Sequence, residues 1–226
     1  MCYPGSNLIK KMKTIYCISG LGADERAFCK LDVKGFELKV IKWLLPMPDE
    51  TLPHYAKRMR EEITEEDPIL MGLSFGGMVC TEIAKQIPVK KIILISSIKS
   101  AKELPLWMKT VAKLKLHKIV RLRSTKFTQP FQNRMLGVET EEEKTLVASL
   151  RREVDLPYTT WAVNQAINWK NDWQHPEIYH IHGDQDNMFP IKKIKANYII
   201  KNAGHFMIMN RATEVSTCIN SILCTT

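Results

Sequence analysis

Residues 68–79 read Pro-Ile-Leu-Met-Gly-Leu-Ser-Phe-Gly-Gly-Met-Val, and this stretch decides the fold. It places the pattern Gly-x-Ser-x-Gly, centred on Ser74, between an apolar run and a segment with helical spacing. The run predicts a buried strand, and Gly72 and Gly76 allow the close backbone approach of a sharp strand-to-helix turn. A serine that merely caps a helix is the alternative. The combination of strand, glycines and helix favours a nucleophile whose hydroxyl is lifted clear of the sheet.

A serine hydroxyl is a weak nucleophile near neutral pH, so this interpretation requires a general base and a group that orients the base. Candidates for both follow along the chain. Residues 182–190 read His-Gly-Asp-Gln-Asp-Asn-Met-Phe-Pro, and His205 follows within Ala-Gly-His-Phe at 203–206. A lone histidine is more often structural than catalytic. Three partners in the order serine, acid, histidine favour the catalytic interpretation.

In these residues the chain resembles the α/β-hydrolase superfamily, in which a late strand ends in His-Gly-x-x-Asp-x-x-x-Pro and a following Gly-His-Phe or Gly-His-Trp carries the base. The resemblance implies Ser74 as the nucleophile, Asp186 as the acid of the triad, and His205 as general base and then general acid. Asp184 is the alternative acid. The spacing to Pro190 favours Asp186.

Acyl chemistry also needs hydrogen-bond donors for the developing oxyanion. The first expected donor is the backbone N–H of Phe75, directly after the serine. The second belongs to the loop after the first core strand, where residues 19–22 read Ser-Gly-Leu-Gly and the superfamily usually has His-Gly-x-Gly. The resemblance implies the N–H of Leu21, and the missing histidine bears on the geometry of the loop more than on activity. A dinucleotide-binding loop would need a third glycine, which Arg-Ala-Phe at 26–28 does not supply.

Six apolar runs predict the strands of a mostly parallel sheet covered by helices on both faces. The runs cover residues 15–18, 38–43, 69–71, 92–95, 178–181 and 198–200. Helices are expected at residues 52–64, 75–86, 158–169 and 213–223. The resemblance implies a minimal α/β-hydrolase sheet of about six strands, without the antiparallel strands that often open it. The length of 226 residues suits one domain, residues 1–226.

The chain between the fourth and fifth predicted strands is far longer than a crossover requires. The strand before it ends near Ser96, and the superfamily carries its lid at this place. Residues 99–172 are therefore expected to form a helical lid inserted into the domain, with helices at 106–117 and 141–154. This lid should form one wall of a substrate pocket.

Positive charge is concentrated in this insertion. The whole chain has 33 Lys and Arg against 24 Asp and Glu, a net of +9, and Lys99 to Met135 holds ten basic residues against the single acid Glu103. A solvated surface is the default interpretation; attraction of anionic substrates or acyl carriers and contact with anionic lipid are the alternatives. Nucleic-acid binding is not expected, because no recognisable module surrounds the patch.

Six cysteines, at positions 2, 17, 29, 80, 218 and 224, show no metal-ligand spacing and indicate no disulfide framework. Cys17 and Cys80 fall within predicted core elements and are expected to pack as small apolar residues. The first residues lack the charged and apolar segments of a secretory signal, and no run reaches transmembrane length. We therefore expect a cytoplasmic protein without a metal or organic cofactor; the oligomeric state stays open.

Together these features predict a serine hydrolase that cleaves a small-molecule carboxylic ester or thioester through an acyl-enzyme on Ser74. The basic insertion favours anionic or carrier-linked acyl groups. A cofactor-free lyase of the hydroxynitrile-lyase type, using the same three side chains, is one alternative. A ligand-binding receptor in which these side chains are vestigial is another, because a fold does not fix a function.

Overall fold

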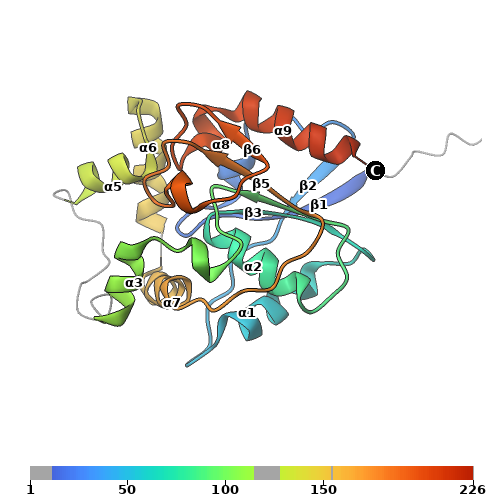
Figure 1. Ribbon diagram of the computed structural model, residues 1–226, viewed down its shortest axis with the longest axis horizontal. Helices are drawn as coiled ribbons and strands as arrows, with labels where there is room; N and C mark the ends of the chain where they lie inside the picture. Colours follow the sequence, from blue (N-terminus) through green and yellow to red (C-terminus); the bar gives the residue numbers. More distant parts are fainter. Residues whose placement is uncertain (1–11, 115–127, 154, 226) are drawn as a thin grey trace, which may run out of the picture.

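The computed structural model describes residues 12–114, 128–153 and 155–225 of the chain (Figure 1). Within this part of the chain, six strands form one sheet in the order β2-β1-β3-β4-β5-β6, and all the pairings are parallel. The strands are β1 (Lys13–Ile18), β2 (Phe36–Val40), β3 (Ile69–Leu73), β4 (Lys91–Ile95), β5 (Ile178–Gly183) and β6 (Tyr198–Ile200). The predicted six-stranded parallel sheet is confirmed.

Helices cover both faces of the sheet, as Figure 1 shows. On one face lie α1 (Leu52–Met59) and α2 (Phe75–Ala84), and on the other α8 (Met207–Asn210) and α9 (Ala212–Cys224). Successive strand residues point to opposite faces, so the two apolar layers share each strand. In β1, for example, Tyr16 packs in the layer of α1 and α2, and Cys17 packs in the layer of α9.

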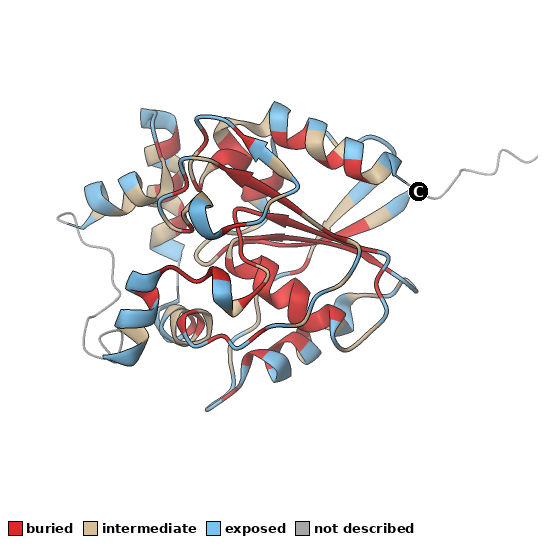
Figure 2. Cartoon of the chain, in the orientation of Figure 1, coloured by how far each residue is buried: buried red, intermediate tan, exposed pale blue. Residues whose placement is uncertain are grey.

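The central strands read as unbroken apolar runs because both of their faces are covered. Every residue of β3 and of β4 is buried, and so is every residue of α2 (Figure 2). Short helical turns complete the connections: η1 (Glu25–Phe28), η2 (Arg60–Glu62), η3 (Ala101–Glu103) and η4 (Ile191–Lys193). Among the described residues, no helix is long and apolar enough to cross a membrane.

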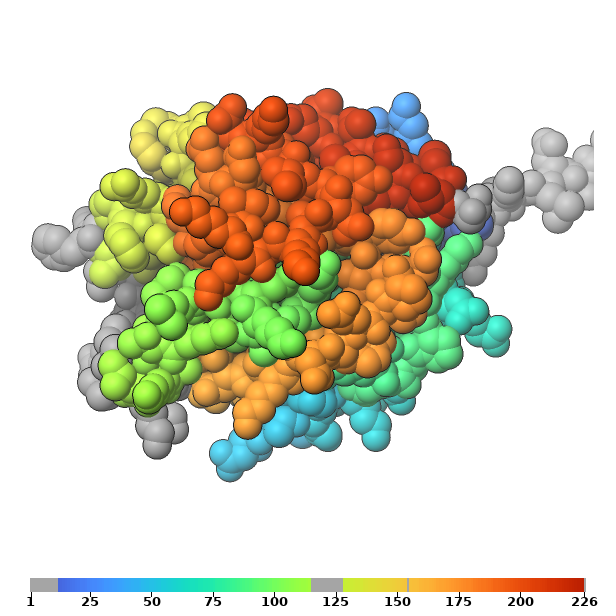
Figure 3. Space-filling model, viewed as in Figure 1, coloured from blue at the N-terminus to red at the C-terminus, as the bar shows by residue number. Residues whose placement is uncertain are grey.

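Helices of the long insertion gather at one end of the sheet (Figure 1). They are α3 (Leu106–Lys113), α5 (Gln129–Leu136), α6 (Glu141–Glu153) and α7 (Leu156–Ile167). In the space-filling view, α3 in green lies against the orange chain of α7 (Figure 3), and these two helices are in contact. The predicted helices at 106–117 and 141–154 correspond to α3 and α6, but residues 115–117 and 154 lie outside the described residues.

Two predicted elements have different bounds in the structure. The second strand, expected at residues 38–43, is Phe36–Val40, because its partner in the described sheet, β1, ends at Ile18 and the chain leaves the sheet after the Ile41 N–H donates to the Cys17 carbonyl at 2.9 Å. The helix expected at 52–64 ends at Met59 and continues only as the turn η2.

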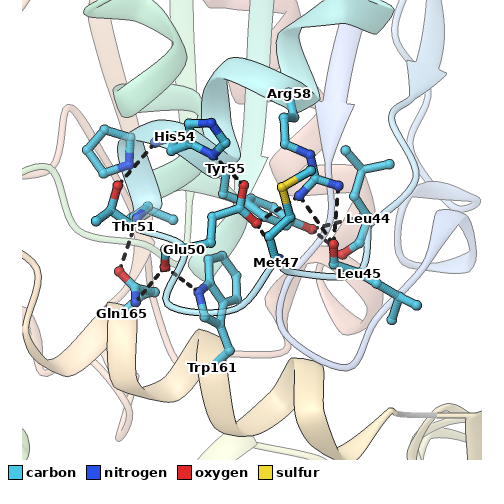
Figure 4. A network of polar contacts seen from close by, with 12 residues as sticks. Leu44, Leu45, Met47, Glu50, Thr51, His54, Tyr55, Arg58, Trp161 and Gln165 are labelled. Carbon is cyan, nitrogen blue, oxygen red and sulfur yellow. Dashed lines mark hydrogen bonds and ion pairs between the residues drawn. The ribbon is translucent and has the colours of Figure 1, made fainter.

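Glu50 ties the insertion to the body of the fold through its backbone carbonyl (Figure 4). The Glu50 side chain is 1% exposed and accepts hydrogen bonds from His54 Nδ1 and Arg58 Nη1, both at 2.7 Å. The Glu50 carbonyl accepts from Trp161 Nε1 on α7 at 2.7 Å. Burial alone would raise the pKa of Glu50, but these hydrogen bonds and one from the Met47 N–H outweigh it and lower that pKa. The network fixes α7 against the start of α1.

The predicted packing role of two cysteines is confirmed. Cys17 and Cys80 are fully buried, and burial raises the pKa of both thiols. All the described cysteines are free. Cys2 lies outside the described residues.

Candidate active site

Ser74 lies at the sharp turn between β3 and α2. Its φ of 52° and ψ of −119° are sparsely populated by residues with a side chain, and such a conformation costs about 1–3 kcal/mol. Two hydrogen bonds hold it there: the Ser74 N–H donates to the Ile95 carbonyl at 2.9 Å, and Ser97 Oγ donates to the Ser74 carbonyl at 2.6 Å. The strand β4 and the residues after it therefore fix the turn that the sequence pattern predicts.

Steric crowding explains the glycines around Ser74. A Cβ atom on Gly72 would lie 2.4 Å from the Cα of Gly77, and one on Gly76 would lie 2.2 Å from the Ile18 carbonyl oxygen. Both distances are far below van der Waals contact with backbone atoms that cannot move aside independently. Only glycine fits at these positions. The Gly-x-Ser-x-Gly pattern is therefore a consequence of the close approach of α2 to the backbones of β3 and β1.

The structure brings Ser74, His205 and Asp186 together, although the serine and histidine are 131 residues apart in sequence. His205 Nδ1 is 2.8 Å from Asp186 Oδ2, and His205 Nε2 is 2.9 Å from Ser74 Oγ. A carboxylate only accepts, so Nδ1 carries the proton and the lone pair of Nε2 faces the serine hydroxyl. The Asp186 carboxylate is buried, and its Oδ1 accepts from the Met188 and Phe189 N–H groups at 2.7 and 2.8 Å.

Asp184, the alternative acid, is turned to a different place. Its N–H donates to the Ile200 carbonyl at 3.1 Å, and its buried Oδ1 has no hydrogen-bond partner among the described residues. Within the described residues, no hydrogen bond or ion pair joins Asp184 to His205. The geometry thus joins the histidine to Asp186, in agreement with the spacing argument from Pro190.

A second histidine supports the Asp186 loop, and sequence reasoning assigned it no role. His182 Nε2 lies 2.8 Å from the Phe189 carbonyl oxygen and 3.5 Å from Asp186 Oδ2. Because a carbonyl only accepts, Nε2 carries a proton. Burial lowers the pKa of His182, so its ring is neutral and Nδ1 accepts from His180 Nε2 at 3.2 Å. The signal was present in the sequence, since His182 opens the motif that contains Asp186.

The two expected oxyanion donors both line the cavity beside Ser74. Neither the Leu21 N–H nor the Phe75 N–H donates a hydrogen bond to any described residue. The loop lies directly against the serine, since a Cβ atom on Gly20 would be 3.3 Å from the Ser74 Cβ. Both N–H groups are therefore available to a hydrogen-bond acceptor that occupies the cavity.

Ser19 stands where the superfamily usually has a histidine, and it braces this loop. Its hydroxyl donates to the Ala23 carbonyl at 2.7 Å and accepts from Trp43 Nε1 at 2.8 Å. The Trp43 ring is stacked on Phe75 with centroids 5.7 Å apart. A serine and a tryptophan thus connect the two segments that carry the unpaired N–H groups. No sequence motif predicts this support, because Trp43 lies outside the Ser-Gly-Leu-Gly segment at 19–22.

Ser74 and His205 face a cavity of about 1640 Å³. The helices of the insertion and the loops of the sheet both contribute to its walls, which are mostly apolar. Residues that line it include Met78, Met108, Val111, Leu146, Val147 and Ile167. Residues of the insertion therefore form part of the wall of this cavity. In the part of the chain that is described, no group of three His, Cys, Asp or Glu side chains is arranged to hold a metal ion.

No protein-family model and no protein of curated function matches the sequence. Solved structures match the fold. A hydrolase from Oleispira antarctica is similar with a TM-score of 0.69 at 11% identity, over 94% of this chain and 92% of that one. An esterase from Thermogutta terrifontis is similar with a TM-score of 0.64 at 17% identity, over 93% of this chain and 89% of that one. An epoxide hydrolase from Bacillus megaterium is similar with a TM-score of 0.69 at 12% identity, over 93% of each chain.

The chain has the α/β-hydrolase fold, which confirms the predicted fold class. At these identities the likeness establishes the fold alone, and the similar structures carry different activities in their names. What the chain does must therefore be argued from its own site.

Proposed function

We propose that this chain is a serine hydrolase that cleaves a small-molecule carboxylic ester or thioester through an acyl-enzyme on Ser74. The observation that carries the proposal is the chain of hydrogen bonds from Ser74 Oγ through His205 to Asp186, with the serine and histidine facing a largely apolar cavity. In this proposal residues 99–172 act as the lid of a single domain.

The first half of the reaction forms the acyl-enzyme. Ser74 Oγ attacks the carbonyl carbon while His205 Nε2 takes its proton, and Asp186 stabilises the resulting imidazolium. The N–H groups of Leu21 and Phe75 receive the negative charge that develops on the carbonyl oxygen. As the tetrahedral intermediate collapses, His205 returns the proton to the departing alkoxide or thiolate.

The second half repeats these steps with water. His205 Nε2 takes a proton from a water molecule, the oxygen attacks the acyl carbon, and the same two N–H groups receive the oxyanion. The proton then returns to Ser74 Oγ, which releases the carboxylic acid. Water is the only reactant besides the acyl-enzyme in this half.

Covalent labelling tests the activated serine. After incubation with a fluorophosphonate probe, intact mass should show a single adduct on the wild-type chain, and peptide mapping should assign it to Ser74. His205→Ala should label much more slowly, because the general base is gone. Absence of the adduct, or an adduct on another residue, would contradict the proposal.

A second mass measurement separates the hydrolase from a lyase. Rapid acid quenching during turnover of an activated ester should trap the acyl group on Ser74, since an acyl-enzyme is an intermediate only in the hydrolase. Turnover of esters without any trapped acyl group would favour the lyase. Tight binding of ligands with no turnover across esters and thioesters would favour the receptor.

Ser19→Ala should lower kcat for ester hydrolysis about tenfold, because it removes the brace of the loop that carries the Leu21 N–H but leaves that donor itself in place. Ser216→Ala is the matched control. Like Ser19, Ser216 is buried, donates one hydrogen bond, to the Ala212 carbonyl, and accepts one, from the Asp32 N–H.

Both serine variants should lose about 1 kcal/mol of unfolding free energy, measured by urea denaturation. Only Ser19→Ala should slow hydrolysis. Equal effects of the two substitutions on kcat would show that Ser19 contributes stability and has no part in aligning the loop.

A further inference from the structure

The charge of the cavity in front of Ser74 is unbalanced. The described residues that line it include the two arginines Arg151 and Arg152 but no Asp or Glu. His205 also lines the cavity and is part of the proposed catalytic group. The Asp186 carboxylate is fully buried behind His205. A neutral apolar substrate would leave this positive charge without a partner inside the cavity.

Arg151 is the more informative of the two arginines because it is half-buried, whereas Arg152 is exposed. It lies on α6, and its Nη2 donates to Asn133 Oδ1 on α5 at 2.7 Å. No carboxylate lies within ion-pair distance of Arg151 in the described part of the chain. A guanidinium has five N–H donors, and the Asn133 amide accepts from only one side of the group.

Arg26 shows how the same fold treats an arginine that has a structural role. Its Nη2 is 2.6 Å from Asp24 and 2.7 Å from Glu153, so two carboxylates compensate its charge. Burial lowers the pKa of Arg151, and no carboxylate of the described residues forms an ion pair that would counter that effect. A partly desolvated cation without a counterion is costly in a free protein and is stabilised by an anionic ligand.

We propose that Arg151 binds an oxyanion, a carboxylate or a phosphate, carried by the substrate at a distance from the reacting carbonyl. The preferred substrates would then be esters or thioesters in which an apolar chain joins the scissile bond to an anionic group. The inference rests on the proposed function and names the substrate class of the same site. The apolar walls accommodate the chain, and the planar guanidinium matches an oxyanion with two parallel hydrogen bonds.

Matched esters test this assignment. One series consists of p-nitrophenyl monoesters of straight-chain dicarboxylic acids, and the other of the same compounds with the distal carboxyl blocked as its methyl ester. The wild-type chain should show a higher kcat/KM for the free acids, with an optimum at one chain length. Arg151→Gln should lower the ratio of acid to methyl ester about tenfold or more, mainly through KM, because a charge-assisted hydrogen bond is lost.

Two further variants separate a specific contact from a general positive field. Lys109→Gln removes the same charge from an exposed position on α3 that does not line the cavity, and it should leave the ratio unchanged. Arg151→Lys keeps the charge but loses the planar fork, so its ratio should be intermediate. The proposal would be overturned if Arg151→Gln and Lys109→Gln lowered the ratio of acid to methyl ester equally. It would also be overturned if salt abolished the effect of Arg151→Gln on that ratio.

A competition experiment on the wild-type chain identifies the preferred anion and needs no variant. It measures how strongly added compounds inhibit hydrolysis of the p-nitrophenyl esters whose distal carboxyl is blocked as a methyl ester. Octanoate and octyl phosphate are compared with octanol, and at least one anion should inhibit the wild-type chain more strongly than the alcohol. The stronger anion indicates whether carboxylate or phosphate is preferred. Octanol as effective as both anions would overturn the inference, while labelling of Ser74 and hydrolysis of the methyl esters would still support the proposed function.

Discussion

Replacing Ser74 with alanine is expected to lower kcat for ester hydrolysis on the order of 10⁵- to 10⁶-fold, because the attacking oxygen of the proposed mechanism is removed. The fold should persist. Among the described residues, the Ser74 side chain is hydrogen-bonded to His205 alone, and the bonds that hold the turn come from main-chain atoms and Ser97. The measurement is steady-state hydrolysis of a p-nitrophenyl ester, with thermal unfolding of both proteins recorded in parallel.

Ser216→Ala is again a useful reference, because it removes a serine hydroxyl on α9 on the far side of the sheet from α2. It should keep wild-type kcat. Hydrolysis by Ser74→Ala at a rate close to that of the wild-type chain would exclude the acyl-enzyme mechanism. If the wild-type chain itself turned over no ester or thioester, the receptor alternative would replace it.

Local geometry explains why the turn at Ser74 is predictable from the sequence, whereas His205 and Asp186 were implied by the family resemblance. There is no room for a Cβ atom at Gly72 or Gly76, so the turn requires glycine at these two positions next to Ser74 in the sequence. The strands of the sheet are recognisable for a similar reason. Burial on both faces produces short apolar runs whose pattern does not depend on knowing the partner strand.

The parts that were missed depend on contacts between residues far apart in sequence. Ser19 meets Trp43 across a crossover, and Glu50 meets Trp161 across 111 residues. Neither pair has a local pattern that distinguishes it from an ordinary polar residue near an aromatic one. Polar networks of this kind are selected by the three-dimensional neighbours they satisfy, so a single sequence does not reveal them.

The missed helix α5 (Gln129–Leu136) has a different cause. Its termini carry recognisable signals, since Pro130 lies in the first turn and Gly137 ends the helix with a φ of 72°. Its apolar residues, however, are not arranged on one buried face, and Phe131 is 67% exposed. A helix without a buried apolar stripe gives little periodic signal, so its caps alone were insufficient for prediction.

Asp186→Asn is expected to lower kcat about 10⁴-fold, a loss of the size that follows when a catalytic histidine is held in the wrong tautomer. The two carboxylate oxygens of Asp186 have different partners. Asp186 Oδ1 accepts from two backbone N–H groups, so in the variant the amide oxygen must remain there and the NH₂ group must face His205 Nδ1. Nδ1 would then accept, and Nε2 would carry its proton toward Ser74 Oγ.

Asp184→Asn makes the same chemical change two residues earlier and serves as the control. Because no hydrogen bond or ion pair joins Asp184 to His205 in the described part of the chain, its replacement should change kcat by no more than a few-fold. The two variants are compared with the same ester, and kcat is followed over pH. A large loss in Asp184→Asn with little loss in Asp186→Asn would reverse the assignment of the acid, because the tautomer argument applies only to the carboxylate that holds Nδ1.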